Sequence, residues 1–359
     1  MNPLLFHILS NVKGNNMLLT VQWKDDSLLL IDQTKLPTKL SYVYCKSYQD
    51  VAAAIKQMIV RGAPAIGVAA AFGLVLAARR SNSRNIGSLL RDINKAYNII
   101  RATRPTAINL QWGLDRLMKK IQNIQSVSKV KETMLDEAIQ MAEEDIFINR
   151  SMGSIGEILL SDGDTILTHC NAGSLATVAY GTALGVIRSA KESGKKIRVI
   201  ATETRPVMQG SRLTAFELQY DNIDVSLIPD TAVGYLMTKG GIKHVIVGAD
   251  RILNTGHVFN KIGTYQIAVL AKCHNIPFYV AAPLSSFDLK NDIDDIVIEE
   301  RSKEEVTKIA EKKIAPTNIK VINPAFDITP PDLITSIITE KGLIFPPYKS
   351  NIKMMTNTK

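Results

Sequence analysis

The chain has 359 residues, of which 46% are hydrophobic and 21% are charged. This composition is typical of a globular protein and excludes a disordered or collagen-like chain, and its three cysteines cannot form a disulfide framework. The net charge of +9 is spread in short groups rather than one long basic block, which argues against nucleic acid or an anionic membrane as partner. We therefore expect a soluble, cytoplasmic protein.

The first part of the chain predicts a small β element followed by helices. Residues 1–16 lack the basic start and cleavage site of a signal peptide, so we interpret them as an N-terminal extension. Two apolar runs within residues 18–35 indicate two strands joined by a turn. From residue 50 to about 160, apolar residues recur at intervals of three and four, which is typical of amphipathic helices. We expect residues 17–160 to form one β/helical domain.

The most apolar run of the sequence covers residues 63–78 and is rich in alanine and glycine. It is shorter than the roughly 20 residues that a membrane-spanning helix needs. Alanine and glycine allow helices to pack closely, so we interpret the run as a helix of a protein core. We expect no membrane-spanning segment.

After residue 163, short β-branched runs alternate with helical stretches. Near-continuous apolar strands between polar turns are typical of a parallel sheet covered on both faces, and the stretches between them are long enough for crossover helices. Five strands are expected, at residues 165–170, 196–203, 224–230, 244–250 and 277–283. The sequence therefore predicts the α/β fold class, with a doubly wound parallel-sheet domain over residues 161–345 and a frayed C-terminal tail over residues 346–359.

Polar residues close four of these strands. Cys170 closes the first, residues 203–205 follow the second, Asp230 ends the third and Asp250 ends the fourth. Ligands of open α/β sheets bind beyond the carboxyl ends of the strands, although polar residues there also cap helices. The sequence contains no phosphate-loop, dinucleotide-binding, nucleophile-elbow or zinc motif. The strand ends thus indicate where a site would lie without naming its reaction.

Cys170 and Asp250 each have a structural and a catalytic interpretation. Cys170 precedes a predicted helix, and a cap at Asn171 or Ser174 would place the thiol near the positive end of the helix dipole, which lowers a thiol pKa. A buried, inert cysteine is the structural alternative. Asp250 caps a helix or pairs with Arg251, or it acts as a general acid in an apolar pocket that raises its pKa.

Three positions combine a cation with a helix start. Arg61 and Gly62 precede Pro64, which suits the first helical position, so free N–H groups and a guanidinium would form a phosphate cradle. A kinked core helix is the alternative. Residues 260–264 are a second cationic helix start. Arg104 is either a third anion contact or an ordinary surface residue.

Together, these segments resemble the S-methyl-5-thioribose-1-phosphate isomerase family. The matching segments follow in family order over residues 18–345: LLLIDQTKLP, RGAPAIGVAAAFG, RPTAINLQWGLDRL, THCNAG, ATETRPVMQGSRLTAFEL, VGADRI and NKIGTYQIAVLAKCHNIPFYVAAP. The resemblance implies a small N-terminal β plus helical domain, a Rossmann-like catalytic domain and a homodimer. It also implies an aldose–ketose isomerase of methionine salvage, an intramolecular oxidoreductase acting on a sugar phosphate with no cofactor and no metal.

The resemblance further implies roles for particular residues. The catalytic acid of the family falls on Asp250 and its catalytic cysteine on Cys170, which acts as a base or stabilises charge during a hydride shift. The substrate-binding residues of the family fall on the following positions: Arg61, Gly62, Ala63, Arg104, Gln209, Asn260 and Lys261.

Two relatives on the same fold remain as alternatives. Ribose-1,5-bisphosphate isomerase shares the cysteine and aspartate but needs an extra cationic contact for its second phosphate. The regulatory subunits of the eukaryotic translation-initiation guanine-nucleotide exchange factor bind other subunits and need neither a catalytic acid nor a thiolate. The presence of Cys170, Asp250 and Arg61 in one chain favours catalysis.

Overall fold

The computed structural model describes residues 17–105, 107–309 and 312–357, so the expected N-terminal extension, residues 1–16, lies outside the described residues. The chain separates into two compact units. Unit 1 contains the chain up to Arg150 together with Gly173–Gly185, and unit 2 contains Ser151–Ala172 and the chain from Val186 onward. The chain therefore passes between the units more than once.

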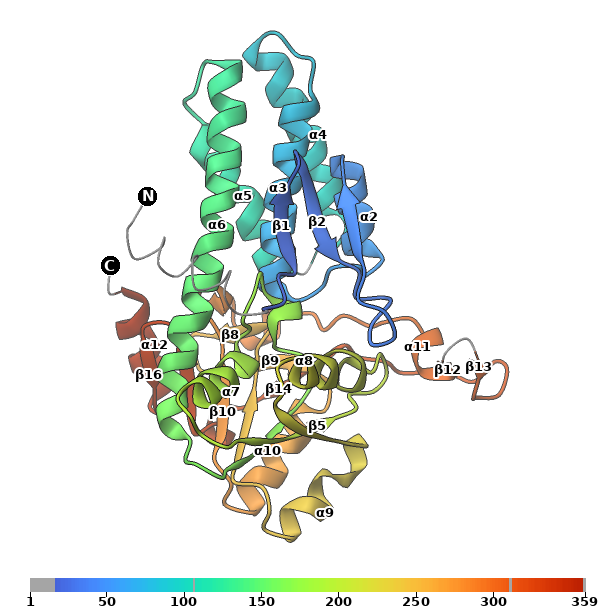
Figure 1. Ribbon diagram of the computed structural model, residues 1–359, viewed down its shortest axis with the longest axis vertical. Coiled ribbons are helices and arrows are strands. Elements are labelled where there is room, and N and C mark those ends of the chain that lie inside the picture. Colours follow the sequence, from blue (N-terminus) through green and yellow to red (C-terminus); the bar gives the residue numbers. More distant parts are fainter. Residues whose placement is uncertain (1–16, 106, 310–311, 358–359) are drawn as a thin grey trace. The chain divides into compact units, whose positions relative to one another are not determined.

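Unit 1 begins with a three-stranded antiparallel sheet and continues with helices, as the sequence predicts (Figure 1). The strands are β1 (Val21–Lys24), β2 (Ser27–Ile31) and β3 (Tyr42–Cys45), the last of which the sequence pattern did not predict. The helices are α2 (Tyr48–Lys56), α3 (Ala63–Arg80), α4 (Ile86–Arg101), α5 (Ile108–Ile121) and α6 (Val127–Gly156), which continues into unit 2. Helix α3 packs against α2, α4, α5, β1 and β2, so it is the centre of this unit.

Every residue of α3 from Ala65 to Ala78 is buried, because the helix is apolar on all sides. Among the described residues, α3 is the one helix whose length and composition would allow it to cross a membrane. However, 78% of that apolar window is buried inside the protein, as in the core helix of a soluble domain. The interpretation of residues 63–78 as a core helix is confirmed.

Unit 2 is built on a seven-stranded sheet. Its strands are β4 (Thr165–Thr168), β5 (Arg198–Thr202), β6 (Asp224–Ile228), β7 (His244–Val247), β10 (Phe278–Ala281), β15 (Ser336–Thr339) and β16 (Gly342–Ile344). They lie in the order β16-β15-β10-β7-β4-β5-β6, and all neighbours are parallel except β15 and β16. The chain runs from β4 to one edge and then returns to the other side of β4, which is the Rossmann-like, doubly wound arrangement. The five predicted strands are confirmed.

Helices connect the strands of the large sheet, as the sequence predicts. They are α7 (Ala183–Glu192), α8 (Ala215–Tyr220), α9 (Val233–Thr238) and α10 (Thr264–Cys273). The helix expected directly after Cys170 is wrong: a 3-10 turn of three residues, Ser174–Ala176, stands there, and α7 begins only at Ala183. Tyr180 and Gly181 have φ values of 72° and 85°, which a right-handed helix does not accommodate.

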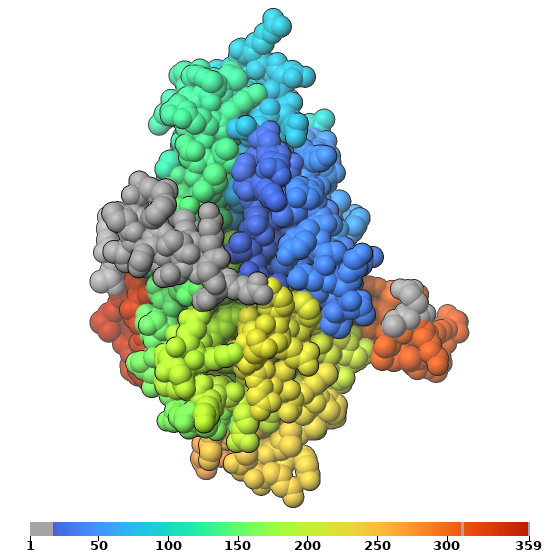
Figure 2. Space-filling model, viewed as in Figure 1, coloured from blue at the N-terminus to red at the C-terminus, as the bar shows by residue number. Residues whose placement is uncertain are grey.

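A second, four-stranded sheet of unit 2 was not predicted. It has the order β11-β8-β9-β14, formed by Phe287–Asp288, Arg251–Leu253, Val258–Lys261 and Phe326–Thr329. Its strands read FD, RIL, VFNK and FDIT, which are short and lack the continuous apolar run that predicts the strands of the large sheet. A further short helix, α11 (Glu304–Thr307), and the strands β12 (Lys308–Ile309) and β13 (Lys312–Lys313) project from the rest of unit 2 and are coloured orange in Figure 2.

The C-terminal segment is helical rather than frayed. Helix α12 covers Tyr348–Asn357, and its residues Tyr348 and Ile352 are buried in the core of unit 2. The Tyr348 hydroxyl donates a hydrogen bond to the carbonyl oxygen of Ile334 at 3.0 Å. The expectation of a frayed tail is wrong here because two apolar anchors, four residues apart, give the helix one buried face.

Candidate active site

Cys170 and Asp250 follow two neighbouring strands of the large sheet. β4 and β7 are parallel, and Leu167 of β4 is paired with Val245 of β7. The strand order reverses between these two strands, because β5 continues on one side of β4 and β10 continues beyond β7. Open α/β sheets bind ligands beyond the carboxyl ends of the strands at such a switch point. The fold therefore brings the two residues to the position where chemistry is expected.

Cys170 is buried, with 9% of its surface exposed, and has a φ of 61°. Its backbone N–H donates to Oγ1 of Thr204 at 2.8 Å, and its carbonyl oxygen accepts from Oγ1 of Thr214 at 2.6 Å. The expectation that a helix dipole lowers its pKa is wrong, because the turn Ser174–Ala176 has neither the length nor the side-chain cap that the argument needs. Any activation of this thiol must come from other groups.

Asp250 is half-buried and lies in the connection between β7 and β8. Its backbone N–H donates to the carbonyl oxygen of Phe259 at 2.9 Å, which joins the switch point to β9. The neighbouring Arg251 forms an ion pair with Asp288 at 2.9 Å between Nη1 and Oδ2. A carboxylate of β11 thus pairs with this arginine.

Asn260 and Lys261 are the last residues of β9. Asn260 is buried, and its Nδ2 donates to Oγ1 of Thr264 at 3.1 Å. The Lys261 ammonium donates to the carbonyl oxygen of Ala325 at 3.0 Å and lies 4.6 Å from the centre of the Phe326 ring. Both side chains are therefore held by the protein at the end of β9, an inner strand of the second sheet.

The start of α10 differs from the anion site that the sequence predicts. Gly263, with a φ of 101°, precedes the helix as expected, but its N–H donates to Oδ2 of Asp327 at 2.7 Å. Burial raises the pKa of Asp327 to about 6, although hydrogen bonds from backbone N–H groups oppose this effect. A carboxyl group of the protein thus occupies the helix start that was expected to bind an anion.

Gln209 is buried just before the π-helical turn Gly210–Thr214. Its Oε1 accepts no hydrogen bond from the described residues. Gly210 has no room for a side chain, because a Cβ there would lie 1.7 Å from the carbonyl oxygen of Thr202. A buried amide oxygen without a protein donor is suited to accept a hydrogen bond from a ligand hydroxyl.

The predicted phosphate cradle of unit 1 forms the start of α3. Gly62 is the N-cap with a φ of 93°, and a Cβ there would lie 2.4 Å from the Cα and carbonyl oxygen of Ala176. The half-buried Arg61 donates from Nε to Oε1 of Gln33 at 3.3 Å, and Nε2 of Gln33 donates to the carbonyl oxygen of Leu175 at 2.8 Å. Pro64 stands in the first turn, as predicted, and Ala63 is the first helical residue.

Arg104 lies in the connection before α5 and is half-buried. Helices α3 and α5 touch near their first turns, since a Cβ on Gly67 would lie 2.6 Å from the carbonyl oxygen of Asn109. Arg61 and Arg104 therefore precede two neighbouring helix starts of the same unit. Helix N-termini and guanidinium groups both favour anions, so this end of the α3–α5 pair is suited to phosphate.

His169 is a buried residue of the site that the sequence reasoning did not use. Its Nε2 lies 2.9 Å from the carbonyl oxygen of Ile262, so this nitrogen donates, and Nδ1 accepts from the Thr202 hydroxyl at 2.6 Å. Burial lowers the pKa of this histidine, consistent with a neutral ring. His169 thus ties the end of β4 to the segment that follows Lys261. Its position directly before Cys170 is the one sequence feature that could have identified His169 as a residue of the site.

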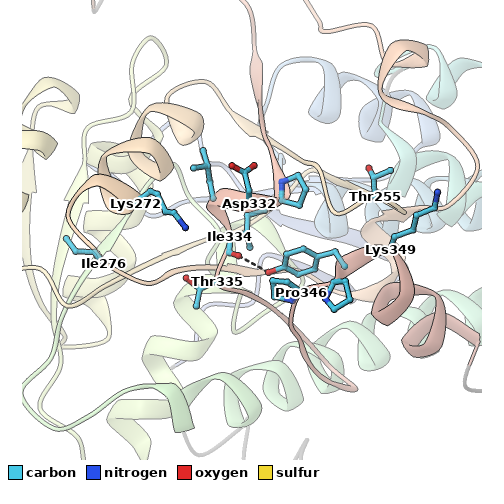
Figure 3. A pocket seen from close by; sticks show the side chains of 12 residues that line it. Thr255, Lys272, Ile276, Asp332, Ile334, Thr335, Pro346 and Lys349 are labelled. Carbon is cyan, nitrogen blue, oxygen red and sulfur yellow. Dashed lines mark hydrogen bonds between the residues drawn. The ribbon is translucent and has the colours of Figure 1, made fainter.

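Two further features of the described residues bear on where a site lies. Within the described parts of the chain, no group of three or more histidine, cysteine, aspartate or glutamate side chains is arranged to hold a metal ion. A cleft of unit 2 lies beside α10 and α12, where Lys272, Asp332 and Lys349 border it (Figure 3). The predicted site residues, all of them described, do not line this cleft.

The chain is similar to a described protein family and, over nearly its full length, to individual known proteins. The model of the initiation factor 2 subunit family matches residues 59–346. A methylthioribose-1-phosphate isomerase from Thermosipho melanesiensis is 54% identical over 338 residues, covering 94% of this chain and 98% of the relative. The crystal structure of 5-methylthioribose 1-phosphate isomerase from Pyrococcus horikoshii is 44% identical with a TM-score of 0.91, covering 96% of this chain and 97% of that one.

A third similar protein has a different description. The crystal structure of subunit delta of the translation initiation factor eIF-2B from A. fulgidus is 53% identical to this chain, with a TM-score of 0.86 and coverage of 94% and 99%. The chain spans nearly the full length of each protein compared. The chain belongs to the initiation factor 2 subunit family and, within it, to the methylthioribose-1-phosphate isomerases.

Proposed function

We propose that this protein is an aldose–ketose isomerase that converts S-methyl-5-thio-α-D-ribose 1-phosphate to S-methyl-5-thio-D-ribulose 1-phosphate in methionine salvage. The observation that supports it most directly is the position of Cys170 and Asp250 beyond the ends of the neighbouring strands β4 and β7. A thiol and a carboxyl group at a switch point supply a base and an acid where ligands bind. The isomerase names of relatives at 54% and 44% identity support the same reaction.

The substrate explains why an acid and a base are both needed. The anomeric oxygen of the sugar bears the phosphate, so the ring cannot open through a free anomeric hydroxyl. Asp250 donates a proton to the ring oxygen as the bond from C1 to that oxygen breaks. Cys170, as thiolate, removes the C2 proton and returns it to C1, while the proton of the 2-hydroxyl group restores Asp250. No proton is gained or lost overall, and C2 becomes the ketone.

A hydride shift from C2 to C1 is the competing route, in which Cys170 stabilises developing charge instead of moving a proton. Isomerisation in deuterated water separates the two routes. Deuterium at C1 of the product supports proton transfer through Cys170, whereas complete transfer of the C2 hydrogen to C1 without exchange supports the hydride shift.

We assign substrate binding to the residues that fall on the substrate-binding positions of the family. Arg61, with Gly62 and Ala63 at the start of α3, and Arg104 before α5 would bind the phosphate, because guanidinium groups and free N–H groups match its oxygens. The buried Oε1 of Gln209 would accept from a sugar hydroxyl. Asn260 and Lys261, at the end of β9, would bind further substrate oxygens.

A second function is favoured by one observation, the translation-factor description of the A. fulgidus protein. A binding subunit would assemble with other subunits and would show no turnover by itself.

We also propose that this chain acts as a cytoplasmic homodimer without a nucleic-acid or membrane partner. Light scattering of the purified protein measures the assembly: a dimer mass supports this proposal, and a monomer mass contradicts it.

The experiment that tests the function compares substrates directly. The purified protein is given methylthioribose 1-phosphate or ribose 1,5-bisphosphate, and ketose phosphate is followed by NMR. Preference for the methylthio sugar supports the proposal. Preference for the bisphosphate keeps the chemistry but assigns a different substrate, and turnover of neither supports the binding subunit.

A further inference from the structure

The peptide groups on both sides of Cys170 are held by threonine hydroxyls. Oγ1 of Thr204 accepts the Cys170 N–H at 2.8 Å, and Oγ1 of Thr214 donates to the Cys170 carbonyl at 2.6 Å. Between these two bonds the residue has a φ of 61°, in the left-handed region that a residue with a side chain rarely adopts. Such a conformation persists only where the surroundings impose it. The two hydroxyls hold the peptide groups on either side of this conformation.

Thr204 is itself held in an uncommon conformation. It is fully buried with a φ of 62°, and its N–H donates to Oδ1 of Asp230 at 2.7 Å. Oδ2 of the same carboxylate accepts the N–H of Arg205 at 2.7 Å. Asp230 stands at the end of β6, so one carboxylate aligns two successive peptide groups beyond β5. The residue that holds the Cys170 N–H is thereby anchored to the next strand of the sheet.

Asn171, the residue that follows Cys170, is also held by buried side chains. Nδ2 of Asn171 donates to Oγ1 of Thr214 at 3.1 Å and to Oε1 of Glu217 at 2.8 Å. Glu217 is fully buried and forms an ion pair with the buried Arg188 at 2.8 Å. Thr204, which follows β5, and Thr214, which precedes α8, thus bond to the peptide groups of Cys170, while Asp230 bonds to Thr204 and Glu217 to Asn171.

We propose that Thr204, aligned by Asp230, is a positioning residue that fixes the backbone of Cys170 and so directs its thiolate at C2 of the substrate. The inference rests on the proposed role of Cys170. Because the backbone dihedrals set the direction of the bond from Cα to Cβ, release of the N–H would let the residue turn toward ordinary φ values and move the sulfur. A displacement of about 1 Å in a reacting group lowers a rate by up to about 100-fold.

The test uses Thr204→Val, which keeps the shape of the side chain but removes its hydroxyl, and Thr204→Ser, which keeps the hydroxyl. We expect Thr204→Val to lower kcat by at least about tenfold with little change in KM, and Thr204→Ser to recover most of that loss. The matched control is Thr339→Val, since Thr339 is a fully buried threonine whose hydroxyl donates to Gly342 at 2.8 Å, in β15 away from the switch point.

A second measurement reports on Cys170 without turnover. Each variant is alkylated with iodoacetamide over a range of pH, and the peptides of Cys170 and the exposed Cys273 are quantified by mass spectrometry. We expect Thr204→Val to change the alkylation rate of Cys170 relative to Cys273 by at least about threefold, and Thr339→Val to leave this ratio unchanged. If Thr204→Val does not fold, Asp230→Asn takes its place, because an amide accepts only one of the two N–H groups.

The outcomes separate this inference from the proposed function. Loss of activity in Cys170→Ala, together with wild-type kcat and alkylation in Thr204→Val, overturns the positioning role alone. Full activity in Cys170→Ala removes the cysteine from the mechanism and overturns both. A folded Thr204→Val with a lower melting temperature but an unchanged kcat and alkylation profile would show that the hydroxyl is structural only.

Discussion

Gly113 of α5 lies directly against the backbone of Gly67 in α3: a Cβ on Gly113 would lie 2.3 Å from the Gly67 carbonyl oxygen. The contact sets the closest approach of the two helices whose starts follow Arg104 and Arg61. We expect Gly113→Ala to lower the free energy of unfolding by about 1–3 kcal/mol, because neither backbone can give way without shifting its helix. Urea unfolding measures this value.

The matched control for this change is Gly87→Ala in α4. A Cβ on Gly87 would meet nothing closer than 3.7 Å, so the substitution should stabilise the protein by about 0.5–1 kcal/mol through the backbone entropy of glycine. Equal stability of the Gly113→Ala and Gly87→Ala proteins would contradict the close-contact argument.

Arg61→Lys should raise KM by at least about tenfold, although it keeps the positive charge. Lysine cannot present the planar pair of donors that matches phosphate, and it loses the bond from Nε to Gln33. Steady-state kinetics with methylthioribose 1-phosphate measure the change. Arg79→Lys is the control, because Arg79 pairs with Asp26 at an exposed site of the same unit; a KM that changes equally in both variants would count against phosphate binding by Arg61.

Asp250→Asn should lower kcat by about 10²–10⁴-fold, since an amide cannot protonate the ring oxygen. The circular dichroism spectrum and melting temperature should stay close to those of the wild type, because asparagine has nearly the same volume and keeps the backbone N–H that bonds to Phe259. Asp294→Asn, at an exposed position of the same unit, should leave kcat unchanged. Wild-type turnover by Asp250→Asn would remove Asp250 from the mechanism.

Because of Asp145, the free energy of unfolding of unit 1 should fall as the pH rises. Burial raises its pKa to about 7, opposed by the hydrogen bond that the Val178 N–H donates to its carboxylate at 2.7 Å. The folded protein thus retains a proton that the unfolded chain releases near pH 4, so the stability from this group is complete below about pH 4 and is lost as the pH passes about 7. Between about pH 4 and about pH 7, the free energy of unfolding should therefore fall by about 1–3 kcal/mol less in Asp145→Asn than in the wild type.

The measurement is the free energy of unfolding at several pH values for the wild type and Asp145→Asn. Asparagine still accepts the Val178 N–H but does not titrate, so the difference between the two curves isolates this one group. Asp136→Asn, on the exposed face of the same helix, is the control and should follow the wild-type curve. Parallel curves for Asp145→Asn and the wild type would contradict the prediction.

The local pattern of the sequence determined the elements with strong periodicity. The five parallel strands and α3 follow from continuous apolar runs, because these elements are buried on all sides, and the other helices of residues 50–160 follow from apolar spacings of three and four residues. The elements without such a pattern were not predicted from the sequence. The strands β8, β9, β11 and β14 are short, and the order of their pairing depends on partners far along the chain.

The residues expected to react followed from the sequence, but the environment of each was decided by tertiary structure. Polar residues after strands pointed to Cys170 and Asp250, and the adjacency of β4 and β7 brought those strand ends together. The expected helix dipole behind Cys170 is replaced by two threonine hydroxyls, and the expected anion site before α10 is taken by Asp327. These contacts join residues 34 to 64 positions apart, and no local propensity records them, because they form only when separate strands and helices pack into one core.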